Sequence, residues 1–252
     1  ADGLRILNTP LPAPRLRWSP ASAASTSNDA LLGVLAIAGE RPQVFAVPLD
    51  GSAPRQLTAA PAGAFAFEFS PDGTNFAYLT RDSPSAEEAR DRTLVLHAGA
   101  PDQPARLVVR PLAGGEPRLV SPPAHYVDSF CWAPNGRELA YAAAPRGGFS
   151  AQYETRLYSV AAAGGEPRSI VDRAGINSRP RFSPDGARIA FITTDTRFDI
   201  MAPRGLAVVD AGGGAPRRLP LGDAWVNDFV WASDSRSLYL QANDGTFGSR
   251  QQ

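Results

Sequence analysis

The side chain that comes nearest to a catalytic nucleophile in this chain is Ser150. It lies in Gly148-Phe149-Ser150-Ala151-Gln152, which approaches the G-x-S-x-G turn that presents the nucleophile of many serine hydrolases between a strand and a helix. Gln152 stands where that turn needs its second glycine in order to pack tightly. We therefore expect Ser150 to lie in a loop between strands, and we predict no catalytic residue in this chain.

Metal and cofactor chemistry has little support in the composition. Two histidines and one cysteine leave few ligands for a transition-metal site. Asp72, Asp185 and Asp234 recur in similar turns, but a single carboxylate per turn is better explained by hydrogen bonding to the turn's own backbone. All 25 basic residues are arginine, so the chain has neither a P-loop lysine nor a Schiff-base lysine. We predict no cofactor and no metal.

Net charge and hydropathy also limit the classes of partner that we expect for this chain. The 25 arginines balance 25 acidic residues, whereas binding to nucleic acid depends on a surplus of positive charge. The longest apolar run, residues 30–38, is far shorter than the ~20 residues that a membrane span needs, and no signal peptide is visible. We predict neither a nucleic-acid nor a membrane partner. The single Cys131 cannot form an internal disulfide, and the compartment, bacterial cytoplasm or periplasm, stays open.

A repeat organises the chain. An aromatic residue followed by a small residue and a turn recurs five times, with anchors 51, 63, 50 and 49 residues apart. The five anchors are Trp18, Phe69, Trp132, Phe182 and Trp231. This period is close to that of a four-stranded propeller blade.

Each repeat has the same predicted internal order of strands and turns. An alternating strand such as Val226 to Trp231 leads into a Ser-Pro-Asp-Gly type of turn, and an apolar second strand follows. A third strand then ends in a Gly-rich turn, and a short fourth strand has the pattern Pro-Arg-x-Leu/Ile, as at Pro216-Arg217-Arg218-Leu219. Two turn types in a fixed order favour a propeller over the alternative, a β-sandwich with repeated hairpins.

The predicted fold is therefore an all-β propeller of four-stranded antiparallel blades, occupying residues 1–252 as a single region. About four and a half to five blades are expected, since the fifth repeat supplies only its first two strands before the sequence stops. Residues 4–7 are expected to form an outer strand of a preceding or closing blade. An open propeller would expose apolar faces and a strand edge, so we expect the chain to be part of a longer one.

The turns Phe-Ser-Pro-Asp-Gly at Phe69 and Phe182, together with Ala-Gly-Gly-Glu-Pro-Arg, resemble the propeller of the prolyl oligopeptidase family of serine peptidases, including its acylaminoacyl and dipeptidyl branch. The polar insertion at residues 81–92, in the second repeat, is similar to bacterial members of that family. TolB-like propellers share the turn motifs. The resemblance covers nearly the whole chain.

The resemblance implies a partner outside this sequence. In that family the propeller precedes an α/β-hydrolase domain, which carries the catalytic residues and is absent from this chain; the propeller limits access, so that peptides reach the active site. The alternative is a non-catalytic TolB-like propeller that binds a protein. A propeller enzyme with a central metal is disfavoured by the shortage of histidines and clustered carboxylates.

The predicted contact face is the blade end that carries the connections between second and third strands. Long segments gather there at residues 81–92, 145–153 and 194–203. We predict that this face meets a substrate or partner through His125, Tyr126, Tyr153 and Trp225; packing of Tyr126 and Trp225 between blades is the alternative.

Two adjacent glutamates and one histidine are the remaining candidate site residues. Glu87 and Glu88 form the only adjacent Glu pair, and dipeptidyl members of the family use such a pair to hold a substrate amino terminus. The Ala and Arg residues around the pair favour a solvated helical turn instead. His97, in the apolar segment 93–97, is predicted to be a structural or surface histidine.

Overall fold

The computed structural model describes residues 5–6, 16–20, 31–82, 103–173, 175–194 and 202–243. These residues form β-strands and one short 3₁₀ helix, η1 (Phe149–Glu154). Within this part of the chain, none of the helices has the length and apolar character that crossing a bilayer would require. The chain divides into two compact units, Ala1–Pro123 (unit 1) and Ala124–Gln252 (unit 2).

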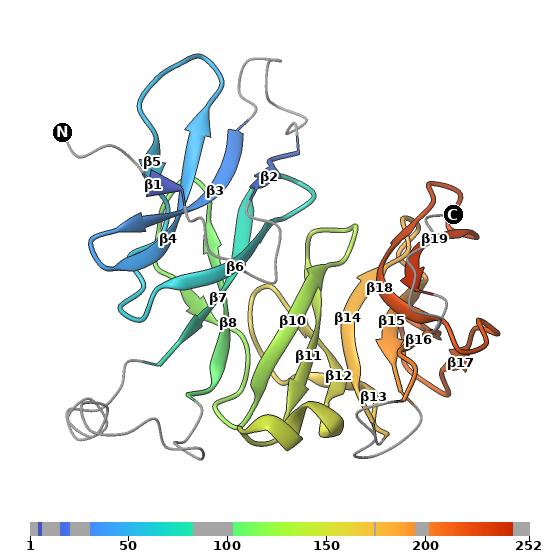
Figure 1. Ribbon diagram of the computed structural model, residues 1–252. Helices are drawn as coiled ribbons and strands as arrows, with labels where there is room; N and C mark the ends of the chain where they lie inside the picture. Colours follow the sequence, from blue (N-terminus) through green and yellow to red (C-terminus); the bar gives the residue numbers. More distant parts are fainter. Residues whose placement is uncertain are drawn as a thin grey trace. The chain divides into compact units, whose positions relative to one another are not determined.

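Unit 1 holds two antiparallel sheets (Figure 1). The strands of the first sheet are β1 (Arg5–Ile6), β2 (Leu16–Trp18), β3 (Leu31–Ala38), β4 (Arg41–Pro48) and β5 (Arg55–Gln56). Those of the second, in the order β6-β7-β8-β9, are β6 (Ala64–Phe69), β7 (Asn75–Arg81), β8 (Ala105–Pro111) and β9 (Arg118–Leu119).

The prediction that residues 4–7 form an outer strand of a preceding or closing blade is wrong for the two that the structure describes. Arg5 and Ile6 form β1, which pairs with Ile37 and Ala36 of β3. Because β4 pairs with the whole of β3 on the other side, β1 shares the inner edge of β3 with β2. β3 extends beyond β2, so its remaining backbone groups on this edge find their partners in β1.

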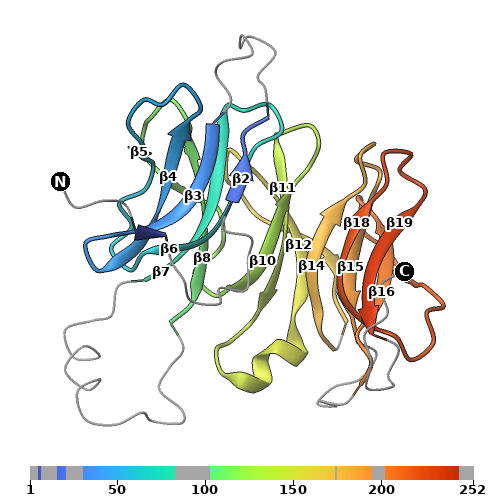
Figure 2. The ribbon, with the colours of Figure 1, turned by 45° about the horizontal axis from the view of Figure 1, so that its top comes forward.

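Unit 2 holds three antiparallel sheets, which lie side by side in Figures 1 and 2. The third sheet has the order β10-β11-β12-β13, with β10 (Tyr126–Trp132), β11 (Glu138–Ala144), β12 (Arg156–Ala161) and β13 (Arg168–Val171). The fourth has the order β14-β15-β16-β17, with β14 (Asn177–Phe182), β15 (Arg188–Thr193), β16 (Gly205–Asp210) and β17 (Arg217–Arg218). The described part of the fifth is a pair, β18 (Trp225–Trp231) and β19 (Leu238–Asn243).

The carboxylates of the recurring turns bind backbone, as predicted. Asp72 accepts a hydrogen bond from the N–H of Thr74 at 3.0 Å, and Asp185 accepts one from Ala187 at 3.0 Å. Asp234 accepts from Arg236 at 2.8 Å. These turns join first and second strands, so each carboxylate stabilises the reversal of its hairpin.

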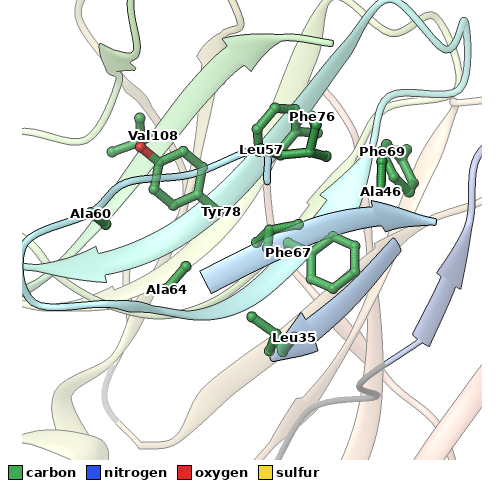
Figure 3. Packing of buried hydrophobic residues seen from close by; sticks show 11 residues of the cluster. Leu35, Ala46, Leu57, Ala60, Ala64, Phe67, Phe69, Phe76, Tyr78 and Val108 are labelled. Atoms are coloured by element: carbon green, nitrogen blue, oxygen red, sulfur yellow. The ribbon is translucent and has the colours of Figure 1, made fainter. Parts of the chain in front are cut away.

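Neighbouring sheets within a unit pack through apolar faces. In unit 1, Leu35 and Val44 of the first sheet meet Phe67, Phe69 and other residues of the second in one buried cluster (Figure 3). The rings of Phe67 and Phe69 lie edge to face, with centroids 5.8 Å apart. Two further clusters join the third sheet to the fourth and the fourth to the fifth. Repeated four-stranded antiparallel sheets that pack face to face are the blades of a β-propeller, which confirms the predicted fold class.

Candidate functional site: polar residues on the first strands of unit 2

His125 lies immediately before β10, in an aromatic stack. Its ring centroid is 4.3 Å from that of Tyr158 in β12, and its Nδ1 is 2.9 Å from the Oη of Tyr141 in β11. Burial lowers the pKa of His125 and raises that of Tyr141. The neutral imidazole and the neutral phenol therefore form the stable hydrogen-bonded pair at pH 7.

Tyr126 and Trp225 occupy equivalent positions in different sheets. Each begins the first strand of its sheet, Tyr126 opposite Ala144 and Trp225 opposite Asn243. Both side chains are half-buried. The structure thus places the two aromatic residues at the end of the sheets where the second strand finishes, which is the end of the predicted contact face.

The connection between β11 and β12 contains η1, which carries Ser150 and Tyr153. Ser150 therefore lies between strands, as expected. Tyr153 is buried, and its carbonyl accepts a hydrogen bond from the N–H of Gly175 at 3.0 Å.

Several sequence candidates fall outside the described residues. Glu87, Glu88 and His97 all belong to the segment 83–102, and most of the connection 194–203 is likewise not described. Their predicted roles stay predictions.

The sequence reasoning missed a cluster that the first strands bring together. A register shift interrupts each of the strands β6, β10, β14 and β18 shortly after its start. In unit 2 these β-bulges present polar residues of three neighbouring strands. We call this set the first-strand polar strip; it comprises Asp128, Ser129, Arg179, Arg181, Asn227 and Asp228.

Hydrogen bonds across neighbouring sheets fix the strip. The N–H of Arg179 donates to the Oγ of Ser129 at 2.8 Å, and the Nη1 of Arg179 donates to the carbonyl of Asn227 at 2.7 Å. Arg181 forms an ion pair with Asp228 at 2.9 Å. Arg179 thereby connects β10, β14 and β18.

The strip presents charge of both signs to solvent. Asp128, Arg179 and Asn227 are exposed, and the Arg181–Asp228 pair is partly exposed. Exposed carboxylate, guanidinium and amide groups can bind the amides and the charged termini of a peptide.

The sequence does carry a signal for these bulges. Two polar residues interrupt the apolar alternation at Asp128-Ser129 and again at Asn227-Asp228, four and three positions before the anchor in both cases. Successive residues of a regular strand point to opposite faces of the sheet, so one of two consecutive polar residues would point into the core. A bulge avoids this, and consecutive polar residues in an otherwise alternating strand therefore indicate one. Among the described residues, no group of three His, Cys, Asp or Glu side chains could hold a metal ion.

Comparisons with known proteins agree with the fold. No family model matches the chain. Dipeptidyl-peptidase 5 of Porphyromonas gingivalis is 29% identical over 120 residues, which is 46% of this chain and 18% of that protein. A TolB homolog of Chlorobium chlorochromatii is 29% identical over 151 residues, 60% of this chain and 28% of that protein. The chain thus spans less than a third of either relative.

Solved structures of diverse proteins share the architecture. A putative TolB from Agrobacterium tumefaciens superposes with a TM-score of 0.54 at 17% identity, over 75% of this chain and 60% of that one. The tricorn protease gives 0.60 at 15% identity, over 89% and 18%. An oligogalacturonate lyase in complex with manganese gives 0.62 at 15% identity, over 92% and 68%. At these identities the likeness shows the fold alone: the chain is a propeller similar to those of peptidases and of TolB.

Proposed function

We propose that this chain is the propeller part of a serine peptidase of the prolyl oligopeptidase family, and that it shapes the access of peptides to a hydrolase domain of the full-length protein. The alignment with Dipeptidyl-peptidase 5 over 120 residues carries the proposal. The turn motifs and the absence of a G-x-S-x-G turn in this sequence agree with it, because the nucleophile then lies in the other domain.

The first-strand polar strip gives the proposal a physical basis. As a peptide passes the strip, its hydrogen bonds to water are replaced by hydrogen bonds to the exposed groups of Asp128, Arg179 and Asn227. Exposed ion pairs contribute only about 0–1 kcal/mol each. Contacts of this strength bind a peptide only weakly, which is appropriate for a surface that peptides pass and not for a tight binding site.

The predicted contact face belongs to the same proposal. His125, Tyr126 and Trp225 are half-buried and have surface left for a ligand. Tyr153 is buried, so it supports η1 from within rather than contacting a peptide. Alanine substitution of Tyr126 or Trp225, measured for thermal stability and for peptide binding, separates a contact role from packing.

The test compares this chain with the full product of its gene. The coding sequence beyond Gln252 should encode a G-x-S-x-G turn, and the full product should cleave chromogenic dipeptidyl or acyl-amino-acid substrates that chain 1–252 leaves intact. In the full product, Asp128→Asn should lower kcat/KM roughly two- to fivefold with kcat little changed, because the contact contributes to binding and not to the chemical step. Asp210→Asn, at an exposed position in β16, is the control. Turnover by chain 1–252 alone would overturn the proposal.

The second candidate is a non-catalytic, TolB-like propeller that binds a protein. The longer alignment, over 60% of this chain, with the TolB homolog favours it. A stop codon within one or two blades after Gln252, with no G-x-S-x-G turn before it, would support this candidate and contradict the first.

A further inference from the structure

Arg179 differs from the other residues of the first-strand polar strip in its backbone conformation. Its φ is 52°, and among the described residues other than glycine only Ser235 also has a positive φ. The following residue, Pro180, restricts Arg179 further. A residue with a Cβ is unfavourable in this conformation, and residues held in this way are concentrated at sites that bind ligands. Glycine would avoid the cost, so an arginine at this position indicates a use for its side chain.

The contacts that Arg179 makes within the chain do not require its positive charge. Its backbone N–H donates to the Oγ of Ser129, which any residue except proline could do. Its Nη1 donates to the carbonyl of Asn227 at 2.7 Å, and this acceptor is neutral. The amide of an asparagine or glutamine side chain can also donate to a carbonyl. The fold therefore makes use of the donors of Arg179 and not of its charge.

The charge of Arg179 is not compensated by a neighbouring carboxylate. Among the described residues, no carboxylate lies within ion-pair distance of its guanidinium. Asp128 of β10 is the other unpaired charge of the strip, and its carboxylate accepts a hydrogen bond from the hydroxyl of Ser129 at 2.9 Å. The strip thus holds an unpaired positive charge on β14 and an unpaired negative charge on β10.

A second guanidinium reaches the same stretch of β18. Arg179 binds the carbonyl of Asn227, and Arg181 binds the carboxylate of the next residue, Asp228, at 2.9 Å. Adjacent Cα atoms are about 3.8 Å apart, so the two guanidinium groups contact β18 at neighbouring positions. Arg181 also lies over the ring of Phe229, at 5.5 Å from its centroid. Two guanidinium groups share one carboxylate here, which leaves a net positive charge.

This positive charge is accessible to a ligand. Arg179 is exposed, and the side chains of Arg181 and Asp228 are 39% and 49% exposed. Within the described part of the chain, the side chain of Arg179 forms a single hydrogen bond, through Nη1, so its Nε and Nη2 groups are available. A guanidinium presents its N–H groups in a planar fork that matches the two oxygens of a carboxylate.

We propose that Arg179, with Arg181 beside it, forms an anion subsite of the first-strand polar strip that binds a carboxylate of a peptide, from its carboxyl terminus or from an acidic side chain. This inference rests on the proposed function, which brings peptides to the strip. The subsite gives acidic peptides a modest advantage over neutral ones, because an exposed pair of charges contributes little and is screened by salt.

The test measures peptide binding to the full product of the gene by calorimetry, after treatment with diisopropyl fluorophosphate. This reagent blocks a serine nucleophile, so the peptides then report on other sites. Two pairs of acetylated alanine peptides are compared: the first pair differs in a free or amidated carboxyl end, and the second pair, amidated throughout, differs in a central Glu or Gln. In at least one pair the acid should bind roughly three- to fivefold more tightly, and the pair that shows this preference identifies the source of the carboxylate. The preference should disappear in about 1 M NaCl.

Three variants examine the residues of the subsite. Arg179→Gln keeps a donor for the carbonyl of Asn227 but removes the charge, so it should abolish the preference for the acid. Asp228→Asn removes the carboxylate that pairs with Arg181 and should increase the preference. Arg137→Gln is the matched control, because Arg137 is an exposed arginine in the hairpin turn of the third sheet, and it should leave the preference unchanged.

The proposal is overturned by absence of binding or by equal affinities for acid and neutral peptide in both pairs. An Arg179→Gln variant that melts normally and keeps the preference would also overturn it. Where Arg179→Gln does not fold, Asp228→Asn decides, and an unchanged or smaller preference contradicts the subsite. Turnover by the untreated product tests the proposed function separately. A product that cleaves no peptide but shows the preference contradicts the peptidase role alone, and one that cleaves peptides without the preference contradicts the subsite alone.

Discussion

The backbone N–H of Arg179 donates to the Oγ of Ser129 at 2.8 Å, so a side chain of β10 holds a residue of β14 that has a positive φ of 52°. Left-handed backbone is unfavourable for a residue with a Cβ, and Pro180, which follows, restricts Arg179 further. Arg179 keeps this conformation because its guanidinium also binds the carbonyl of Asn227. The contacts between sheets therefore outweigh the local backbone preference.

Because of this positive φ, we predict that the usual order of stability of alanine and glycine variants is reversed at position 179. Both Arg179→Ala and Arg179→Gly lose the side-chain bond to Asn227, but only glycine relieves the left-handed strain. The glycine variant should therefore be more stable than the alanine variant by about 1 kcal/mol in urea unfolding. At Arg181, which has no positive φ, the order should be the usual one, with glycine about 0.5–1 kcal/mol less stable. The same order at both positions would contradict the interpretation.

Gly33 of β3 is expected to tolerate no larger residue. A Cβ at this position would lie 2.4 Å from Cε2 of Phe67 and 2.7 Å from Cε2 of Phe69, both in the buried cluster of unit 1. Gly33→Ala should lower the free energy of unfolding by about 1–3 kcal/mol, because the two rings cannot both move within a packed core. Gly39→Ala tests the specificity of this effect: nothing lies within 4 Å of its Cβ position, so only its positive φ contributes to the loss.

The hydroxyl of Thr58 is expected to stabilise unit 1 through two buried partners. Its Oγ1 accepts from the N–H of Val44 at 2.9 Å and donates to Oε1 of Gln43 at 2.7 Å. Thr58→Val keeps the shape but leaves the Val44 N–H without this acceptor, so we expect a loss of about 1–3 kcal/mol in the free energy of unfolding. Thr58→Ser, which keeps the hydroxyl, should recover most of it. A valine variant as stable as the serine variant would show that the hydroxyl contributes nothing.

The repeat made most of this fold predictable. The turn carboxylates Asp72, Asp185 and Asp234 bind their own backbone as expected, and the second and third strands appear where apolar alternation places them. These features depend on residues close together in sequence, so a pattern in one repeat identifies them in the next.

The candidate site was less predictable because it depends on pairing between distant segments. Which residues the bulges of β10 and β18 present depends on the register against β11 and β19, and the partner of Arg179 in β10 lies 50 residues away in sequence. The position of β1 depends likewise on how much of the β3 edge β2 leaves open. The packing of His125 against Tyr141 and Tyr158 needs three strands to be placed first.

The burial of His125 predicts that stability falls as the pH is lowered through the range in which free histidine titrates. Burial lowers the pKa of His125 below its ordinary value of 6.5, so the unfolded chain takes up a proton at a pH where the folded chain does not. Because the unfolded state then binds more protons, the free energy of unfolding declines as the pH falls below about 6.5, and this decline ends once the pH is below the folded pKa.

The measurement is the urea midpoint of the chain at intervals from about pH 7.5 to about pH 5. His125→Phe should abolish the part of the decline that belongs to His125, whereas His97→Gln provides a matched control for the second histidine. The turn carboxylates do not interfere with this measurement. Hydrogen bonds from Ser183 and from a backbone N–H lower the pKa of Asp185, and hydrogen bonds from backbone N–H groups lower that of Asp234. Their contribution to the free energy of unfolding is therefore lost only below the ordinary aspartate pKa of 3.8. A pH profile unchanged by His125→Phe would mean that the imidazole is as well solvated in the folded chain as in the unfolded one.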